Sequence, residues 1–306
     1  MIITVFPGQG AQTPGFLEPW LAVPGVRDRL AQYSDDSDVD LIAAGTQWDA
    51  DRIRDTRVAQ PLIVAASLIS YQALTDAAGT APGGAAGHSV GEIAALVAAG
   101  VLDEHDGMRL VGLRGRAMAE AAAAEQTGMS AILGGDRDAV LARLAELDLT
   151  AANHNGAGQI VAAGALAPLA QLAETPVAAS RVIPLQVAGA FHTRYMAPAV
   201  DALRSAAAEI TASEPALTLW TNRDGTTVAG GAAALDLLVD QVASPVRWDL
   251  CMESFAAHGV TGIIELAPAG TLTGLAKRAL RGVPTVAVKT PEDLAAAAAL
   301  LTGDGA

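Results

Sequence analysis

The sequence predicts an α/β protein with a mostly parallel β-sheet in a large domain and a small βαββαβ unit inserted into it. Short apolar runs alternate with longer helical patterns in the first 124 residues, which is typical of parallel strands joined by helices. The order then changes to strand, helix, strand, strand, helix, strand, which is a complete small fold by itself. Apolar residues make up 51% of the chain and charged residues only 17%, and this composition favours a well-buried body over disorder.

The change in the order of predicted strands and helices divides the chain into two parts. At 306 residues it exceeds a single domain of typical size, about 100–200 residues. The large α/β domain is assigned to residues 1–124 and 189–306, and a ferredoxin-like insertion to residues 125–188.

The large domain begins with a predicted strand at residues 2–6, where β-branched and aromatic residues dominate. A short apolar run at 85–88 predicts the next strand. Apolar spacing typical of helices predicts three helices in this part, at 61–77, 91–99 and 104–123.

The insertion and the rest of the large domain follow in order. In the insertion, strands are predicted at 129–134, 149–153, 159–163 and 181–186, and helices at 137–147 and 166–174. After it, helices are predicted at 193–210, 235–242 and 250–258, and strands at 217–220, 262–266 and 285–288.

Composition excludes several classes of function. The chain has 19 Lys and Arg against 33 Asp and Glu, a net charge of −14, which argues against a nucleic-acid partner. The most apolar long window, residues 58–75, contains Gln60, Pro61 and Ser67 and is expected to be a buried helix rather than a membrane span. The single cysteine, Cys251, permits no internal disulfide and no paired-cysteine zinc site. The amino terminus lacks a cationic region and a cleavage signal, so a cytoplasmic location is expected.

The pentapeptide Gly87-His88-Ser89-Val90-Gly91 is the strongest chemical signal. A G-x-S-x-G sequence between a strand and a helix predicts a nucleophile elbow, which lifts the serine hydroxyl out of a tight turn. An ordinary glycine-rich strand-to-helix turn is the alternative interpretation. The glycine-rich loop at residues 6–12 follows the first strand and can bring a main-chain amide to the same crevice, although it also fits a structural turn.

Seven segments, in order, resemble one family. They are FPGQGAQ, TRVAQP, GHSVGE, LRGRAM, GAFH, PVRW and LTGLAKR. They resemble the malonyl-CoA:acyl-carrier-protein transacylases, which occur free-standing and as acyltransferase domains of fatty-acid and polyketide synthases. The resemblance covers nearly the whole chain, and it implies a hydrolase-like α/β domain with a ferredoxin-like insertion.

The resemblance implies a serine–histidine dyad. Ser89 corresponds to the acylated nucleophile, and His192 to the general base and acid that a serine hydroxyl needs near neutral pH. A main-chain carbonyl orients the imidazole in the family, and the matching residue is Gln241, with no role expected for its side chain. The main-chain amides of Gln9 and Val90 correspond to the oxyanion hole.

The same resemblance implies that the acyl group is malonyl. Arg114 corresponds to the arginine that binds the malonyl carboxylate with two charge-assisted hydrogen bonds. A structural salt bridge to an internal carboxylate is the alternative for Arg114, and Arg116 is expected to be solvated. Phe191 precedes the base, where malonyl-selective relatives tend to have Phe and methylmalonyl-selective ones a small residue.

Four further residues match family positions in or near the acyl site. Met118 and Gln60 are expected to line or buttress the pocket, Asn155 to lie near the edge of the insertion, and His88 to shape the site beside the nucleophile. Two stretches depart from the family pattern, Gly156-Ala157 and the run at 267–270, and neither includes the dyad.

The resemblance implies malonyl-CoA as substrate and an acyl carrier protein as acceptor, with no metal and no bound cofactor. A monomer is expected, with no nucleic-acid or membrane partner. Because carrier proteins are usually acidic, docking requires a local basic patch. Its candidates are Arg181, Arg194, Arg223, Lys277, Arg278 and Arg281. A thioesterase or esterase with the same elbow, and a non-catalytic docking module, are the rival functions.

Overall fold

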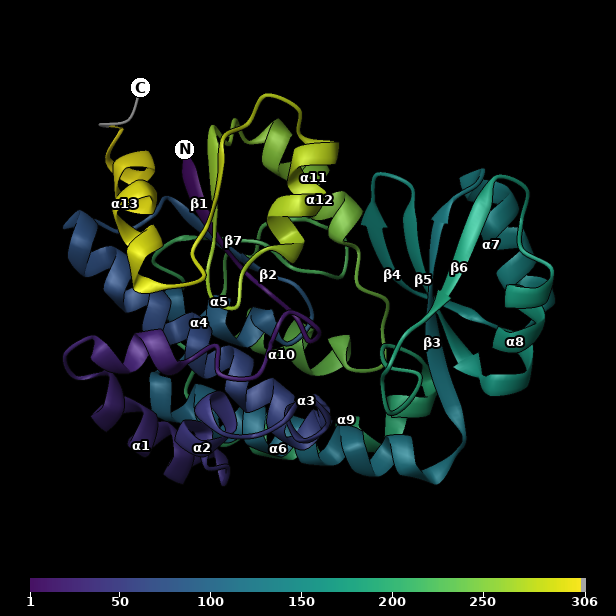
Figure 1. Ribbon diagram of the computed structural model, residues 1–306, viewed down its shortest axis with the longest axis horizontal. Helices are drawn as coiled ribbons and strands as arrows, with labels where there is room; N and C mark the ends of the chain where they lie inside the picture. Colours follow the sequence, from purple (N-terminus) through teal and green to yellow (C-terminus); the bar gives the residue numbers. More distant parts are fainter. Residues whose placement is uncertain (304–306) are drawn as a thin grey trace.

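The structure, a computed structural model, describes residues 1–303 and is built on two separate β-sheets (Figure 1). The larger sheet has five strands in the order β7-β2-β1-β8-β9, and every neighbouring pair is parallel. Its strands are β1 (Ile2–Phe6), β2 (Gly84–Gly87), β7 (Thr218–Leu219), β8 (Gly262–Glu265) and β9 (Thr285–Ala287). The predicted α/β class with a parallel sheet is therefore confirmed.

The smaller sheet is antiparallel and has the strand order β4-β5-β3-β6. Its strands are β3 (Thr127–Gly134), β4 (Thr150–Gly156), β5 (Gln159–Ala165) and β6 (Ser180–Pro184). Two helices, α7 (Arg137–Glu146) and α8 (Leu166–Glu174), belong to the same segment. Figure 1 shows this teal unit set to one side of the large sheet and its helices.

Helices surround the large sheet. They are α1 (Val26–Ser37), α2 (Leu41–Thr46), α3 (Ala50–Arg54), α4 (Thr56–Ala78), α5 (Gly91–Ala98), α6 (Glu104–Ala124), α9 (Ala197–Ala207), α10 (Gly231–Gln241), α11 (Trp248–Ala257), α12 (Thr271–Ala279) and α13 (Leu294–Thr302). Short 3-10 helices lie at Glu18–Ala22, Arg194–Met196 and Pro291–Asp293.

Alternate side chains of the central strands pack into two different hydrophobic cores. Phe6 and Ile264 belong to the main apolar cluster, whereas their neighbours Val5 and Ile263 belong to a second cluster with Trp220, Trp248 and Phe255. Successive side chains of a strand point to opposite faces, so the sheet separates these cores. A third cluster lies inside the small unit.

The helix α4 is the chain's most apolar long helix. Among the described residues it alone is long and apolar enough to cross a membrane by length and composition, and 72% of its most apolar window is buried inside the protein. It begins at Thr56, five residues before the prediction, because the Asp55 side chain accepts a hydrogen bond from the Arg57 N–H and caps it. Pro61 lies inside the helix rather than at its start.

Other predictions differ from the structure where local patterns are weak. No helix range was predicted for α1, α2, α3, α12 or α13. Ala-rich α13 has almost no polar residue to mark a face, so its periodicity is invisible. The single helix predicted at 193–210 is a 3-10 turn followed by α9, with Pro198 in the first turn of α9.

The small unit is joined to the large domain through main-chain hydrogen bonds. Strand β4 is an edge strand, and His154 N–H donates to the Val246 carbonyl at 2.9 Å. Val246 N–H in turn donates to the Ala152 carbonyl at 2.8 Å. These bonds fix β4 against the segment that leads into α11.

Buried Glu265 holds the start of α12 against the end of β8. Its carboxylate accepts hydrogen bonds from the main-chain N–H groups of Gly270, Leu272 and Thr273 and from the Thr273 hydroxyl, at 2.8–2.9 Å. A negative charge at a helix N-terminus also interacts favourably with the helix dipole. The side chain therefore fixes α12 over the carboxyl end of the large sheet.

Replacing this carboxylate by an amide should destabilise the protein. Glu265→Gln turns one acceptor into a donor that faces main-chain N–H groups, and we expect the free energy of unfolding to fall by about 2 kcal/mol. Urea denaturation measures the change, and exposed Glu120→Gln on α6 is the control, expected within about 0.5 kcal/mol of wild type. Equal stability of the two variants would contradict this role for Glu265.

Candidate active site

The turn between β2 and α5 places Ser89 at its apex. Ser89 has a left-handed backbone, with φ of 53°, which is uncommon for a residue with a side chain. A Cβ atom at Gly87 would lie 2.1 Å from the Glu92 nitrogen, and one at Gly91 would lie 2.2 Å from the Phe6 carbonyl oxygen. Only glycine fits at both positions, so the pentapeptide forms a tight strand-to-helix elbow.

His192 lies against the Ser89 hydroxyl. Its Nε2 is 2.7 Å from Ser89 Oγ, and its Nδ1 is 2.9 Å from the main-chain oxygen of Gln241. Because a carbonyl only accepts hydrogen bonds, Nδ1 carries the proton and Nε2 is free to accept the Ser89 O–H. His192 also has a left-handed backbone, with φ of 60°. The arrangement can remove a proton from a serine hydroxyl.

Burial keeps the His192 ring neutral. Only 3% of the residue is exposed, and this burial, with the positive charge of Arg114, lowers the pKa of His192 to about 3. The hydrogen bond with Gln241 acts in the opposite direction. A neutral imidazole is the form that serves as a base.

Two main-chain amides near Ser89 have no protein acceptor among residues 1–303, those of Gln9 and Val90. The Ser89 amide, in contrast, donates to Asn222 Oδ1 at 2.7 Å. The Gln9 side chain donates to the Arg54 carbonyl at 3.1 Å, which ties the glycine-rich loop to α3. Free N–H groups at this place can stabilise an oxyanion.

Arg114 is buried behind the dyad, with only 1% exposed. Its Nη1 donates to Gln60 Oε1 at 2.6 Å, and its Nη2 donates to Gln241 Oε1 at 2.9 Å. Its Nε has no hydrogen-bond partner in the described part of the chain. Gln60 also donates to the sulfur of Met118 at 3.4 Å. The guanidinium therefore rests on glutamine oxygens, and no carboxylate contacts it directly within residues 1–303.

Two residues near the dyad were not predicted from the sequence. Buried Glu92 accepts hydrogen bonds from the Asn222 main-chain N–H and from the Gln241 side chain. Asn222 also donates to the Gly87 carbonyl at 2.7 Å and so holds both sides of the elbow. Glu92 is the last residue of the GHSVGE segment, so its place in that motif was a signal that could have identified it. Asn222 has no such signal, because it follows a two-residue strand and lies 130 positions from Glu92.

Two side chains behave differently from the sequence expectation. The Gln241 side chain, for which no role was expected, contacts Glu92, Arg114 and the Ser89 carbonyl. Arg116 is half-buried rather than solvated, because its Nη1 donates to the Ser37 carbonyl at 3.0 Å.

The dyad opens into a cleft of about 230 Å³ between the two parts of the chain. Its walls come from the glycine-rich loop, the elbow, β3 to β5, the segment after β6 and the start of α12. Phe191 and Asn155 line it, as do Leu185, Leu272 and Leu275. His88 also lines it, with Nε2 at 2.9 Å from Asn155 Oδ1, and its ring packs on the edge of Trp248. Polar side chains on β4, β5 and α12, those of Asn153, Gln159 and Thr271, also line the cleft.

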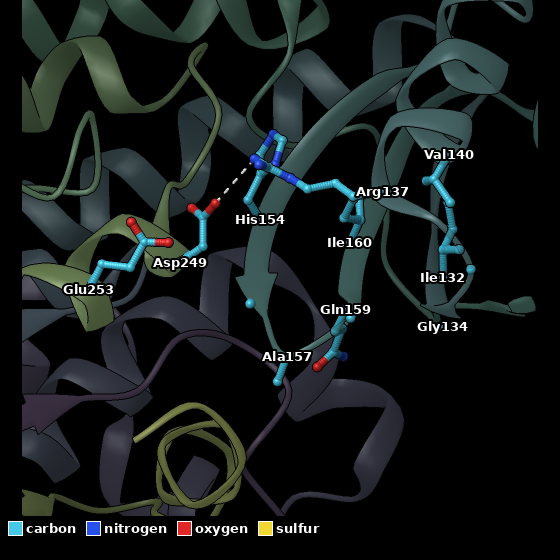
Figure 2. Close-up of a pocket in the computed structure, with 13 residues that line it drawn as sticks. Ile132, Gly134, Arg137, Val140, His154, Ala157, Gln159, Ile160, Asp249 and Glu253 are labelled. Atoms are coloured by element: carbon cyan, nitrogen blue, oxygen red, sulfur yellow. Dashed lines mark hydrogen bonds and ion pairs between the residues drawn. The ribbon is translucent and has the colours of Figure 1, made fainter. Parts of the chain in front are cut away.

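A second cavity of about 190 Å³ lies behind the β4–β5 hairpin, between the small unit and α11 (Figure 2). Gln159 lines both cavities, so the hairpin is the wall between them. An ion pair of 3.4 Å between Arg137 and Asp249 crosses this second cavity. Neither Ser89 nor His192 reaches it, and no cluster of three metal-ligating side chains occurs within residues 1–303.

The proposed docking arginines differ in their surroundings. Arg194 forms a two-pronged ion pair with Asp148, and Arg223 lies 3.4 Å from Asp224. Lys277 and Arg278 are exposed at the end of α12, whose first residues line the cleft.

Comparison with known proteins gives one family throughout. A profile described as the acyl transferase domain matches residues 3–298. The malonyl CoA-acyl carrier protein transacylase of Mycobacterium tuberculosis H37Rv is 54% identical over 296 residues, covering 96% of this chain and 98% of that protein. The protein of the same name from Escherichia coli K12 is 38% identical over 300 residues, covering 96% and 97%.

Solved structures agree with these matches. A crystal structure of MCAT from M. tuberculosis superposes with a TM-score of 0.95 at 54% identity, covering 97% of this chain and 99% of that one. A malonyl-transacylase in complex with its type II PKS acyl-carrier protein has a TM-score of 0.92 at 33% identity, covering 97% and 98%.

The neutral state of His192 is directly measurable. We expect its ring nitrogen shifts, recorded by NMR on protein with 15N-labelled histidine, to stay those of the Nδ1–H tautomer between about pH 5 and 8. The signals are assigned by their loss in His192→Gln. A titration midpoint near 6.5, the value of an unperturbed histidine, would contradict the buried neutral ring.

Proposed function

The chain belongs to the acyl transferase domain family and transfers a malonyl group from malonyl-CoA to an acyl carrier protein, and we propose that it does so through an ester on Ser89. The observation that carries this proposal is the hydrogen-bonded series from Ser89 Oγ through His192 to the Gln241 carbonyl. It has the form of an activated nucleophile with an oriented base.

The first half-reaction forms the ester. Ser89 Oγ attacks the thioester carbonyl as His192 Nε2 takes its proton, and the tetrahedral oxyanion accepts hydrogen bonds from the amides of Gln9 and Val90. The C–S bond then breaks, and His192 returns the proton to the departing thiol of coenzyme A. The second half-reaction reverses this order. His192 takes the proton of the phosphopantetheine thiol, whose sulfur attacks the ester, and Ser89 leaves as the hydroxyl.

Arg114 is the proposed partner of the malonyl carboxylate. A carboxylate that leaves water must find donors, and a guanidinium supplies two parallel N–H groups. Arg114 already uses one N–H of each terminal nitrogen on glutamine oxygens, and its Nε is unpaired within residues 1–303. This leaves donors for an incoming anion. Gln60 and Met118 then act behind it, since Gln60 contacts both residues.

Three cleft residues have proposed roles in shape and selectivity. Phe191 lines the cleft beside the base, where its ring limits the space around the malonyl α-carbon. His88 and Asn155 brace each other across the two parts of the chain, and burial lowers the pKa of His88, which keeps its ring neutral. His88 therefore supports the wall and not the proton transfer.

The finer features of the fold belong to the same proposal. A ferredoxin-like assignment of residues 125–188 is supported by the order β4-β5-β3-β6 with α7 and α8 in a βαββαβ sequence. A hydrolase-like large domain, residues 1–124 and 189–306, is supported by the elbow at the carboxyl end of β2. We further propose a cytoplasmic monomer that needs no metal or bound cofactor, because Ser89, His192 and the two amides supply every group the reaction needs.

Acylation of Ser89 can be seen by mass. Brief mixing with malonyl-CoA should add one malonyl group to the intact protein, and Ser89→Ala should abolish the adduct. Arg114→Ala should slow malonyl acylation about 100-fold, because a buried charge-assisted contact contributes roughly 3 kcal/mol. Acetyl-CoA is the control, since acetyl has no carboxylate and its slower reaction should change little. Release of free malonate without an adduct would instead favour a thioesterase.

The size of Phe191 should set the choice between malonyl and methylmalonyl. We expect Phe191→Ser to raise the ratio of methylmalonyl to malonyl kcat/KM about 10-fold, because one methyl group contributes about 1–3 kcal/mol in a fitted site. Leu185→Ser, at the exposed mouth of the same cleft, is the matched control. A ratio equal in both variants would contradict the role of Phe191.

A further inference from the structure

One buried charged group beside the dyad has no part in the reaction steps above. Glu92 is the second residue of α5, three positions after Ser89, and is 3% exposed. Both of its carboxylate oxygens accept hydrogen bonds, one from the Asn222 main-chain N–H and the other from Gln241 Nε2. A buried carboxylate with two fixed donors is costly unless it is compensated.

Gln241 lies between the Glu92 carboxylate and the positive charge of Arg114 and contacts both. The Gln241 amide donates from Nε2 to Glu92 and to the Ser89 carbonyl, the latter at 3.0 Å, and its Oε1 accepts from Arg114. The main-chain oxygen of the same residue accepts from His192. One glutamine thus contacts the proposed base, the proposed carboxylate-binding arginine and the nucleophile's own backbone.

The direction of the Gln241 amide is set by its neighbours. Arg114 has only donors, so it requires the amide oxygen, and an ionised Glu92 has only acceptors, so it requires the amide nitrogen. If Glu92 offered a donor instead, the amide would face donors on both sides. The carboxylate is therefore the group that holds the amide in the orientation that Arg114 needs.

We propose that Glu92 is a positioning residue for malonyl transfer, which fixes the Gln241 side chain and, through it, the orientation of Arg114 and the main-chain support of His192. The inference rests on the roles proposed above for His192 and Arg114. Glu92 itself touches no reacting atom.

The two donors aimed at the carboxylate oxygens favour the ionised form of Glu92, and burial opposes it. Burial raises the pKa of Glu92 to about 8, whereas the Asn222 N–H, the Gln241 amide and the charge of Arg114 lower it. Burial likewise lowers the pKa of Arg114 to about 10, and the charge of Glu92 raises it. Each ion thus stabilises the charged form of the other across the glutamine between them.

The substitution Glu92→Gln tests the hydrogen-bond pattern with little change in size. The new amide must direct its NH2 group either at the Asn222 N–H or at the Gln241 NH2 group. Rotation of the Gln241 amide would relieve the second contact but would turn its NH2 group toward Arg114. Every arrangement places two hydrogen-bond donors against each other. The Gln241 side chain must therefore shift, and Arg114 shifts with it.

The experiment measures kcat and KM for malonyl-CoA and acetyl-CoA with a carrier protein as acceptor. Glu92→Gln should lower kcat/KM for malonyl about 100-fold, the cost of a small displacement of a positioning group, and KM for malonyl-CoA should rise. Acetyl transfer reports His192 without Arg114, so it should fall less. Exposed Glu120→Gln, the same change on the helix that carries Arg114, is the control and should keep the malonyl-to-acetyl ratio of the wild type.

A double variant, Glu92→Gln with Gln241→Glu, separates positioning from packing. It restores alternating donors and acceptors from Asn222 to Arg114 with the same total charge, but it removes the donor to the Ser89 carbonyl. We therefore expect malonyl kcat/KM to recover at least 10-fold over the single variant without reaching the wild-type value. Circular dichroism shows whether the single variant folds. If it does not fold, the proposal requires the double variant to reach about a tenth of the wild-type kcat/KM for malonyl.

Three results would overturn the inference. They are a Glu92→Gln enzyme within about twofold of wild type, an equal loss for malonyl and acetyl, or a double variant no better than the single one. Failure of the proposed function would be seen without any change at Glu92. It would appear as no acylation of Ser89 in the wild type, or as undiminished malonyl transfer by Arg114→Ala.

Discussion

The hydrogen bond from the His192 ring to the Gln241 main-chain carbonyl is the contact on which the site depends. It fixes the proton on Nδ1, directs Nε2 at the Ser89 hydroxyl and uses a neutral partner to do so. A carboxylate in this place would favour the imidazolium, whereas here burial and Arg114 disfavour it. The base remains neutral until it receives the serine proton. Because Gln241 ends α10, the placement of that helix sets the geometry of catalysis.

Residues far apart in the chain meet because the central strands are parallel. The loop with Gln9 follows β1, the elbow with Ser89 follows β2, and Asn222 follows β7, so all three leave the same edge of the sheet. Ligands bind in the crevice outside the carboxyl ends of parallel strands for this reason. The small unit supplies the opposite wall and contributes none of the groups proposed to react.

Sequence reasoning found those parts of the site that have a local signature. The elbow was visible because its G-x-S-x-G pattern is contiguous in the sequence, and His192, Arg114 and Gln241 were reached by resemblance. Glu92 and the Gln241 side chain were not, because their contact joins positions 149 residues apart and depends on how α5 and α10 pack. The same distinction explains which strands and helices were predicted. Strands with a clear apolar run were found, whereas α13, which is almost uniformly apolar, shows no face in its sequence.

The main-chain bonds between β4 and Val246 have a consequence for solubility. Edge strands expose unpaired N–H and C=O groups that can pair with another chain and start aggregation. Strand β4 is such an edge, and its outer groups at Ala152 and His154 are occupied by Val246 of the same chain. The contact that joins the small unit to the catalytic domain thus also removes a surface on which two copies of the protein would otherwise associate.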